Sequence, residues 1–423
     1  MRVFYPVFFS MAVITVFSLV EITLLKRMHA SWWTRRWIRI SSYAIPVMGF
    51  CALTAWSAGI FSNARAIALA GSYATAAVLI IGLALMLSLP LSGLLHRITA
   101  RGDTRREGAS VPVPRLIERR AFLMGTAAAL PIAAVAAGSA GMAASLRDPE
   151  IPEVPLSFAT LPSALDGFRI AHISDVHLGL FLGLKDFERM AELVAAARPD
   201  LVLLTGDIVD DPLLYPDALR LAAAIPSRYG VFASLGNHEY FRNITAVHAA
   251  YERGSVPLLL NAGRTLGIGD ASLHVAGLDD PRSLGKIPED FFVNALDHAM
   301  RDAPANAFTV LLSHRPEGFN AASERGIPLT ISGHTHGGQI GFLGRSVFET
   351  LLPERYMWGA YERNGCRLYT SAGAGHWFPY RLGCPAEIPL YILKREQRVP
   401  ETKNPAAVPQ LRIKTGNGPA GKR

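Results

Sequence analysis

Five short apolar stretches after residue 167 are each followed at once by residues whose side chains can bind metal ions. The stretches are Phe168–Ile173, Leu201–Thr205, Val231–Leu235, Thr309–Leu312 and Leu329–Ile331. Between them, Lys185–Ala197 and Asn243–Arg253 have the spacing of amphipathic helices. Short apolar runs that alternate with helical patterns are typical of strands in stacked β-α units. The sequence therefore predicts an α/β domain in which the strand ends meet.

The polar residues after these predicted strands form one chemical set. In chain order they are Asp175, His177, Asp207, Asn237, His238, Glu239, His314, His334 and His336. In open α/β sheets a site forms beyond the carboxyl ends of the strands, so the five turns are expected to converge. Carboxylates, imidazoles and an amide without thiolates favour Mn, Fe, Zn, Ni or Mg. So many ligands oversupply one tetrahedral ion, and a pair of ions ~3.5–4 Å apart accounts for them better.

The last of these turns is Gly333-His334-Thr335-His336. Residues i and i+2 of an extended segment point to the same side, so the two imidazoles are expected to project together beyond the strand end.

The first third of the chain is apolar and predicts membrane helices. The apolar runs are Val3–Leu25, Ile40–Phe61, Ala66–Leu95 and Ala121–Leu146, and a helix of about 20 residues crosses ~30 Å of hydrocarbon. Arginines are concentrated in the first and third connections, which the positive-inside rule assigns to the cytoplasm. The fourth run follows Glu118-Arg119-Arg120, so a twin-arginine export signal is an alternative to a fourth span. Both alternatives export the domain after residue 147, whereas a run that did neither would leave it in the cytoplasm.

The charge distribution argues against a nucleic-acid partner. Residues 1–150 hold 15 Lys+Arg and 6 Asp+Glu, and the remainder holds 27 and 28. The basic surplus belongs to the apolar region, and a nearly neutral domain lacks the basic patch of a nucleic-acid binder.

Three cysteines exclude a disulfide-rich scaffold. Cys366 and Cys384 are either a pair or two buried thiols.

The order Asp-x-His, Gly-Asp, Gly-Asn-His-Glu, His, Gly-His-x-His resembles the calcineurin-like metallophosphoesterase superfamily over residues 168–393. The later stretches 337–339, 368–373 and 381–385 are similar to its membrane-attached bacterial subgroup. The resemblance implies a four-layer α-β-β-α sandwich that follows the α-helical transmembrane region. It also implies two metal sites that share the bridging ligand Asp207, one with Asp175, His177 and His336 and the other with Asn237, His314 and His334.

The same resemblance implies a catalytic histidine, His238, at the leaving group. Asp210 would orient this histidine, as in the phosphatase branch of the family, although Asp211 stands where that branch has arginine. Arg315 and Arg381 are either phosphate contacts, because a guanidinium grips phosphate bidentately, or members of ion pairs.

The expected function is hydrolysis of a phosphodiester or pyrophosphate by in-line attack of a hydroxide that bridges two divalent ions. Mn²⁺ is the first choice of metal, with Fe, Zn, Ni or Mg as alternatives, and a lipid-linked substrate is one option. The alternative is a non-catalytic membrane sensor or scaffold that keeps the fold.

The expected organisation has four parts. Residues 1–147 form a membrane region of three to four helices, 148–166 a Pro-rich linker, 167–395 the phosphoesterase domain and 396–423 a disordered tail. The protein is expected to be a multi-pass protein of the bacterial inner membrane, in contact with the lipid bilayer, with its catalytic domain outside the cytoplasm.

Overall fold

The structure is a computed structural model of the 423-residue chain. It describes residues 4–104, 114–282, 287–288, 290–352 and 355–396. The tail expected from residue 397 onward lies outside the described residues.

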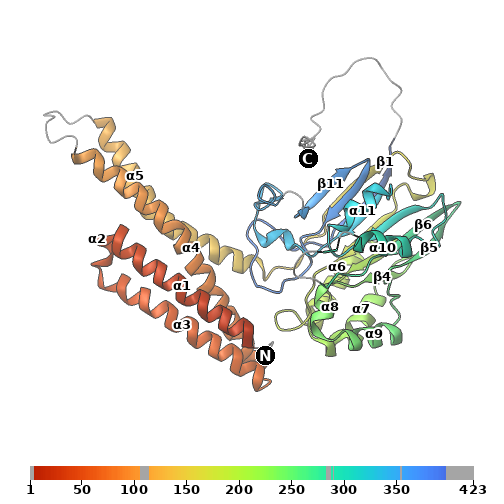
Figure 1. The fold of residues 1–423 in the computed structure, drawn as a ribbon, viewed down its shortest axis with the longest axis horizontal. Helices are drawn as coiled ribbons and strands as arrows, with labels where there is room; N and C mark the ends of the chain where they lie inside the picture. The colour runs from red at the N-terminus through yellow and green to blue at the C-terminus, as the bar shows by residue number, and fades with distance from the viewer. Residues whose placement is uncertain (1–3, 105–113, 283–286, 289, 353–354, 397–423) are drawn as a thin grey trace, which may run out of the picture.

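The apolar region is a bundle of long helices (Figure 1). The helices are α1 (Phe4–Met28), α2 (Ala30–Trp33), α3 (Arg36–Phe61), α4 (Arg65–Thr104) and α5 (Pro114–Ala144). Four stretches are long and apolar enough to cross a membrane: Phe8–Met28, Arg36–Phe61, Arg65–Ile98 and Ala121–Ala144. By length and composition, these include the fourth run whose role the sequence left open.

Helix α4 is the centre of the bundle and packs against α1, α3 and α5. Small residues allow close approach: a Cβ on Gly71 would lie 2.3 Å from the backbone nitrogen of Trp56. This type of contact is common between helices in membranes, where close backbone packing replaces the hydrophobic drive to associate.

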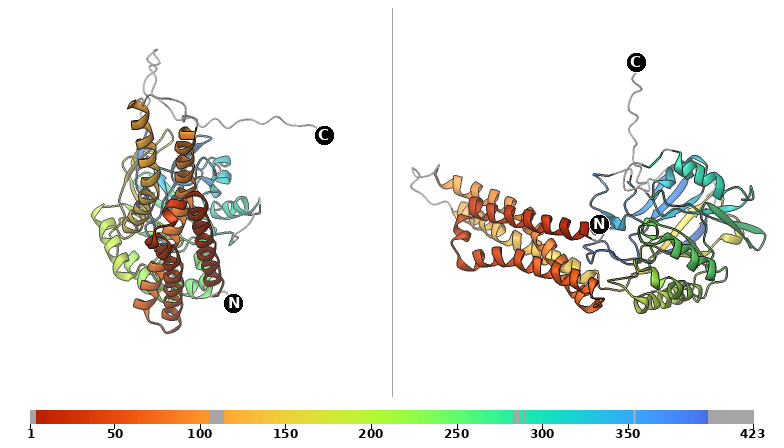
Figure 2. Two further views of the ribbon diagram at one scale, coloured as in Figure 1. Left: turned by 90° about the vertical axis from the view of Figure 1, so that its left-hand side faces the viewer. Right: turned by 60° about the horizontal axis from the view of Figure 1, so that its bottom comes forward.

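The second part of the chain contains two sheets that lie face to face (Figures 1 and 2). The first has the strand order β1 (Glu153–Phe158), β13 (Leu390–Arg395), β2 (Arg169–Ile173), β3 (Leu201–Thr205), β4 (Val231–Ser234). The second has the order β11 (Gly359–Arg363), β12 (Cys366–Thr370), β8 (Leu329–Ser332), β7 (Phe308–Leu312), β6 (Ala271–Gly277), β5 (Ala262–Ile268). A separate hairpin pairs β9 (Gly341–Phe342) with β10 (Arg345–Ser346).

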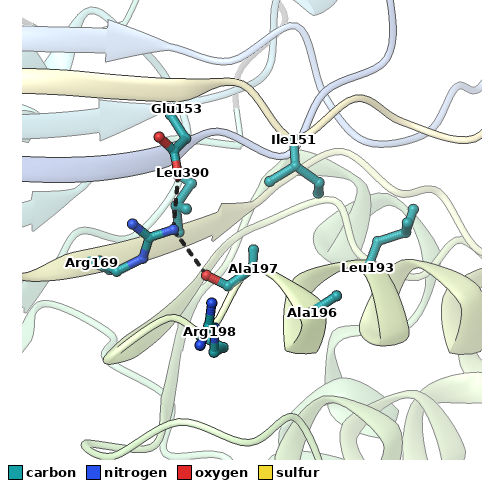
Figure 3. A pocket seen from close by; sticks show the side chains of 8 residues that line it. All are labelled: Ile151, Glu153, Arg169, Leu193, Ala196, Ala197, Arg198 and Leu390. Carbon is teal, nitrogen blue, oxygen red and sulfur yellow. Dashed lines mark hydrogen bonds and ion pairs between the residues drawn. The ribbon is translucent and has the colours of Figure 1, made fainter.

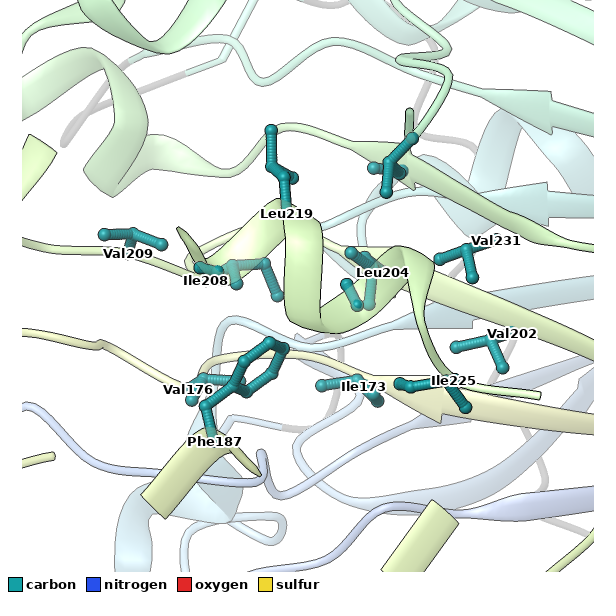
Figure 4. Packing of buried hydrophobic residues seen from close by; sticks show 14 of the residues in the cluster. Ile173, Val176, Phe187, Val202, Leu204, Ile208, Val209, Leu219, Ile225 and Val231 are labelled. Atoms are coloured by element: carbon teal, nitrogen blue, oxygen red, sulfur yellow. The ribbon is translucent and has the colours of Figure 1, made fainter. Parts of the chain in front are cut away.

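Period-two alternation along the strands determines the layers. On β3, Leu201 and Leu203 belong to the core between the sheets, where they join Val310 of β7 and residues of β8. Their neighbours Val202 and Leu204 face the opposite way. They pack beneath the helices α6 (Leu184–Ala196), α7 (Tyr215–Ala223) and α9 (Ile244–Arg253), as Figure 4 shows for part of this cluster.

The second sheet is covered in the same way on its outer face. Ala276 and Leu311 pack against α10 (Phe291–Ala299) and α11 (Gly318–Glu324). Short helical pieces complete the domain: η1 (Ser163–Leu165), η2 (Pro212–Leu214), α8 (Asn237–Arg242) and η3 (His336–Gln339). The order is helix, sheet, sheet, helix, which is the four-layer α/β architecture expected from the sequence.

The prediction of a linker over residues 148–166 is wrong for its central part. Residues 153–158 form β1, which runs parallel to β13 at the edge of the first sheet. Leu156 and Phe158 are buried in the core between the sheets. An edge strand tolerates Pro155, which has no N–H to donate, so the prolines that suggested a linker do not exclude a strand.

Candidate metal centre

The strands β2, β3 and β4 run parallel in one sheet, and β7 and β8 run parallel in the other. The carboxyl ends of all five strands lie at the same edge of the sandwich, so the turns that carry the ligands meet there. Groups of histidine and aspartate with ligand atoms within 4.8 Å of one another form at this edge. The candidate centre therefore receives residues from both sheets.

The backbone at these turns is strained. The left-handed region is unfavourable for residues other than glycine, yet five ligand candidates adopt it. These are Asp175, His177, Asp207, His334 and His336, with φ between 50° and 70°. Such conformations cost about 1–3 kcal/mol each and cluster at functional sites. The turns thus give up local stability to direct side chains into the centre.

Glycines precede several of these residues because there is no room for a side chain. A Cβ on Gly236 would lie 2.3 Å from an Asp207 carboxylate oxygen. A Cβ on Gly333 would lie 2.0 Å from an Asp175 carboxylate oxygen. The glycines of the Gly-Asn-His-Glu and Gly-His-x-His motifs therefore let backbone and carboxylates approach closely.

The first cluster consists of Asp175, His177 and His336, all buried. The Nε2 atoms of His177 and His336 are 3.0 Å apart. His336 Nε2 is 3.6 Å from Asp175 Oδ1. Both oxygens of Asp175 also accept from the backbone N–H of His334, at 3.0 and 3.1 Å, so this carboxylate links the two histidines of the last turn.

The second cluster consists of Asp207, His314 and His334. His314 Nε2 is 3.3 Å from Asp207 Oδ2 and 3.3 Å from Asn237 Oδ1. The other ring nitrogen of His314 donates to the carbonyl of Thr205 at 2.8 Å. This bond fixes the ring so that Nε2 faces the cluster.

Asp207 belongs to the second cluster and also lies near the first, because it forms a third group of potential ligands with His177 and His238. Its Oδ2 is 3.3 Å from His314 Nε2 and 3.9 Å from His177 Nε2. Its Oδ1 accepts from the backbone N–H of His238 at 2.8 Å. Burial opposes ionisation, but the surrounding imidazoles of His314, His238 and His177 outweigh it and lower the pKa of Asp207 well below its usual value.

The geometric premise for the His-x-His pair is wrong. His334 and His336 are both in the left-handed region, not in an extended segment. His334 joins the cluster of Asp207 and His314, and His336 joins that of Asp175 and His177. The imidazoles separate because β8 ends at Ser332 and the left-handed backbone that follows does not keep the two-residue repeat of a strand.

Glu239, which the sequence grouped with the potential ligands, is a buried residue with a structural role. Its carboxylate accepts from the N–H groups of Asp207 (3.0 Å), Ile208 (3.0 Å) and Gly236 (2.8 Å), and from the Tyr215 hydroxyl (2.6 Å). It therefore ties the β3 turn to the β4 turn. The available signal was its place three residues after Gly236, which is a capping-box spacing.

His238 lies at the rim of the centre, with 21% of its side chain exposed. Its Nδ1 donates to Asp210 Oδ1 at 2.7 Å. Burial lowers the pKa of His238, but Asp207 and Asp210 together outweigh this effect and raise it to about 9. Asp210 also accepts from Arg242 at 3.1 Å, so an arginine reaches this carboxylate from the end of α8, although position 211 is an aspartate.

The two arginines expected at the substrate have other partners. Arg381 is 1% exposed and donates to the carbonyls of Gly373 (3.2 Å) and Gly375 (2.5 Å), with His336 Nδ1 at 3.3 Å. A guanidinium so enclosed supports the loop behind His336, and the phosphate-contact prediction is wrong for it. Arg315 donates through Nε to the buried carboxylate of Asp280 at 2.7 Å, which is the ion-pair alternative.

Two further histidines lie near the centre. His172 is fully buried between Tyr391 and Thr205, and burial lowers its pKa to about 3, as expected of a neutral core histidine. His376 is 2% exposed, and its ring is tilted against that of Phe181 with the centroids 5.6 Å apart. Cys366 and Cys384 are both free and buried, so the unpaired alternative holds.

A surface cavity of about 770 Å³ lies elsewhere on the domain. It is lined by Ile151, Glu153, Arg169, Leu193, Ala196, Ala197, Arg198 and Leu390 (Figure 3). Arg169 begins β2, whereas Asp175 follows its end. This cavity therefore lies at the amino ends of the strands, opposite the carboxyl ends that carry the ligands.

Residues 168–338 match the calcineurin-like phosphoesterase family. An uncharacterised metallophosphoesterase of Aquifex aeolicus is 31% identical over 244 residues, which cover 53% of this chain and 85% of that protein. The chain belongs to the calcineurin-like phosphoesterase family. It is accordingly a metallophosphoesterase, a hydrolase that acts on phosphoester bonds.

Relatives of this phosphoesterase occur in bacteria and in eukaryotes. The uncharacterised metallophosphoesterase YkuE of Bacillus subtilis is 29% identical over 289 residues, or 66% of this chain and 98% of that protein. A transmembrane protein with a metallophosphoesterase domain from Danio rerio is 27% identical over 277 residues, or 60% of each chain.

Glu239→Gln is expected to destabilise the phosphoesterase fold itself. The amide places a donor group among three backbone donors, and each unsatisfied buried N–H costs about 1–3 kcal/mol. Thermal unfolding of the full chain in detergent with EDTA measures the effect without any metal. Tyr215→Phe removes one of the bonds to the same carboxylate and should lower the midpoint less. Equal midpoints for Glu239→Gln and the unmodified chain would contradict the structural role.

Proposed function

We propose that the centre binds two divalent metal ions. One ion would be held by Asp175, His177 and His336, and the other by Asn237, His314 and His334, with Asp207 shared. The proposal is supported by the two groups of converging ligand atoms and by the position of Asp207 within reach of both.

The residues present suit such ions. The ligand atoms are carboxylate oxygens, imidazole nitrogens and one amide oxygen, a mixture that suits Mn, Fe, Zn, Ni or Mg. Burial, together with the nearby charge of Asp207, raises the pKa of Asp175, and positive charge in the first cluster would relieve this cost. We propose Mn²⁺ as the native metal. Two such ions would activate a water and neutralise charge on the phosphoryl group.

His238 is proposed to act on the leaving group. Its Nδ1 is bound to Asp210, so Nε2 is the nitrogen that remains for a proton transfer. Arg242 holds the second oxygen of Asp210 at 3.1 Å, which restrains the carboxylate. His238, Asp210 and Arg242 thus form a chain of bonds that orients the imidazole toward the substrate.

The proposed reaction is hydrolysis of a phosphodiester or a pyrophosphate, with in-line displacement of the leaving group that His238 protonates. A non-catalytic sensor or scaffold that keeps the fold is the alternative. The observation that favours the enzyme is that the two clusters and the oriented His238 all occur together at one edge of the sandwich.

Activity and metal content together test the proposal. The full chain in detergent with Mn²⁺ is expected to hydrolyse bis(p-nitrophenyl) phosphate, and Asp207→Asn should abolish both turnover and the second metal. His238→Ala should lower kcat about 100- to 10,000-fold, the usual contribution of general acid catalysis, with metal content unchanged. His298→Ala, on the exposed side of α10, is the matched control. No turnover above Asp207→Asn across nucleotide, phospholipid and sugar-pyrophosphate substrates would favour the scaffold.

We further propose that the protein is a multi-pass inner-membrane protein with an extracytoplasmic catalytic domain, and that its substrate is lipid-linked. The arginines of the first and third connections support the orientation, and contacts between the helices and the site loops support a substrate at the membrane. Arg65, at the start of α4, donates to the carbonyl of Gly179 at 3.3 Å. Tyr73 of α4 contacts Phe181, with ring centroids 5.3 Å apart. Both contacts fall on the loop that follows His177, so the centre lies near the end of the membrane helices.

Reporter fusions at the carboxyl end of the full chain test the orientation. Alkaline phosphatase fused there is expected to be active and a green fluorescent protein dark, because the first is active only outside the cytoplasm. A fusion at residue 104, after α4, should show the reverse pattern. A fluorescent carboxyl-terminal fusion would overturn the proposed orientation.

A further inference from the structure

Most exposed large apolar side chains of the described phosphoesterase domain fall within one short part of the chain. Among the described residues after 147, exposed large hydrophobic residues are Leu213, Phe241 and a set between 342 and 377. That set comprises Phe342 (71% exposed), Leu343 (86%), Val347 (42%), Leu351 (74%), Leu352 (42%) and Trp377 (55%). Scattered exposed leucines are normal, but a group of this kind marks an interaction surface.

We propose that residues 341–352, here named the apolar hairpin, insert into the lipid bilayer beside the membrane helices. The proposal concerns a lipid surface as partner and does not depend on the reaction that the centre catalyses.

The hairpin turn carries a side chain that its conformation disfavours. Strands β9 and β10 pair Phe342 with Arg345, so Leu343 and Gly344 form a two-residue connection. Both residues have positive φ, 50° and 76°, which is the pattern of a type I′ turn that prefers Asn-Gly. A leucine at 86% exposure in this position gains nothing from the domain. Insertion of the leucine into hydrocarbon would explain why it is there.

The base of the hairpin is fixed to the segment that contacts the membrane helices. Gly341 donates to the carbonyl of Leu382 at 2.8 Å, and Leu382 donates to the carbonyl of Gln339 at 2.9 Å. The preceding residue, Arg381, donates its backbone N–H to the carbonyl of Gly141 in α5 at 2.8 Å. Only the segment Arg381–Leu382 therefore lies between the hairpin and α5, a helix long and apolar enough to cross the membrane.

The segment that anchors the hairpin contacts α5 close to the end of this helix, so the hairpin is expected at the membrane boundary. A Cβ on Gly141 would lie 2.3 Å from the ring of Tyr380, so this ring packs against α5 three residues before its end at Ala144. Three residues of helix span ~4.5 Å, and aromatic residues such as Tyr380 and Trp377 are typical of the membrane interface. Figures 1 and 2 show the light-blue segment around the hairpin on the side of the domain that faces the bundle.

Nitroxide accessibility in vesicles tests the insertion. The full chain with Cys51→Ser, since Cys51 is exposed whereas Cys366 and Cys384 are buried, would carry one label at Leu343→Cys or Leu351→Cys. In phosphatidylethanolamine–phosphatidylglycerol vesicles, oxygen should relax both labels strongly and an aqueous nickel complex weakly. Leu213→Cys is the matched control, because Leu213 is 85% exposed and lies on η2, and its label should respond to nickel.

A substitution that suits the turn separates insertion from folding. Leu343→Asn gives the Asn-Gly pair that a type I′ turn prefers, so thermal unfolding should be unchanged or improved. In that variant the label at position 351 should gain access to nickel. Labels at 343 and 351 that respond to nickel as strongly as the label at 213 would overturn the proposal. Labels shielded from both reagents would also overturn it, because a protein partner or a second copy would then cover the hairpin.

Discussion

The carboxylate of Asp207 is the group on which the rest of the centre depends. It lies between imidazoles contributed by both sheets and is itself positioned by a backbone turn in the left-handed region. Glu239 stabilises that turn by accepting from the N–H groups of Asp207 and Ile208 and from that of Gly236 in the next turn. Because one buried carboxylate fixes another, a change at either would shift ligands of both clusters. The inter-sheet core behind them supplies the rigidity that keeps the strained turns in place.

Much of the domain could be predicted from the sequence because its strands are buried and regular. The runs that end before Asp175, Asp207 and His314 correspond to β2, β3 and β7 within one or two residues. Strand β1 was missed because Pro152 and Pro155 are ordinary in a linker, and only its place at a sheet edge makes them tolerable. The phosphoesterase family and the convergence of the ligands followed from residue order alone.

Side-chain partners from distant segments could not be predicted in this way. Arg242, the last residue of α8, reaches Asp210 across 32 residues of sequence, and no spacing rule predicts this contact. Arg381 is enclosed by the carbonyls of its own loop, a contact that depends on a fold of the chain between 373 and 381. The His-x-His turn shows the same limit, since the motif predicted the two ligands but not the left-handed backbone that directs them to different clusters.

The apolar helices lie close to the centre, because α4 contacts the loop after His177 and α5 contacts the segment before Leu382. The centre is proposed to hold a pair of ions that share Asp207. Electron paramagnetic resonance of the full chain loaded with Mn²⁺ tests it most directly, together with metal content. Two ions per chain with the exchange-coupled spectrum of neighbouring Mn²⁺ are expected, replaced by an isolated six-line spectrum in Asp207→Asn. One ion per chain, or two ions without coupling in the unmodified chain, would contradict the account.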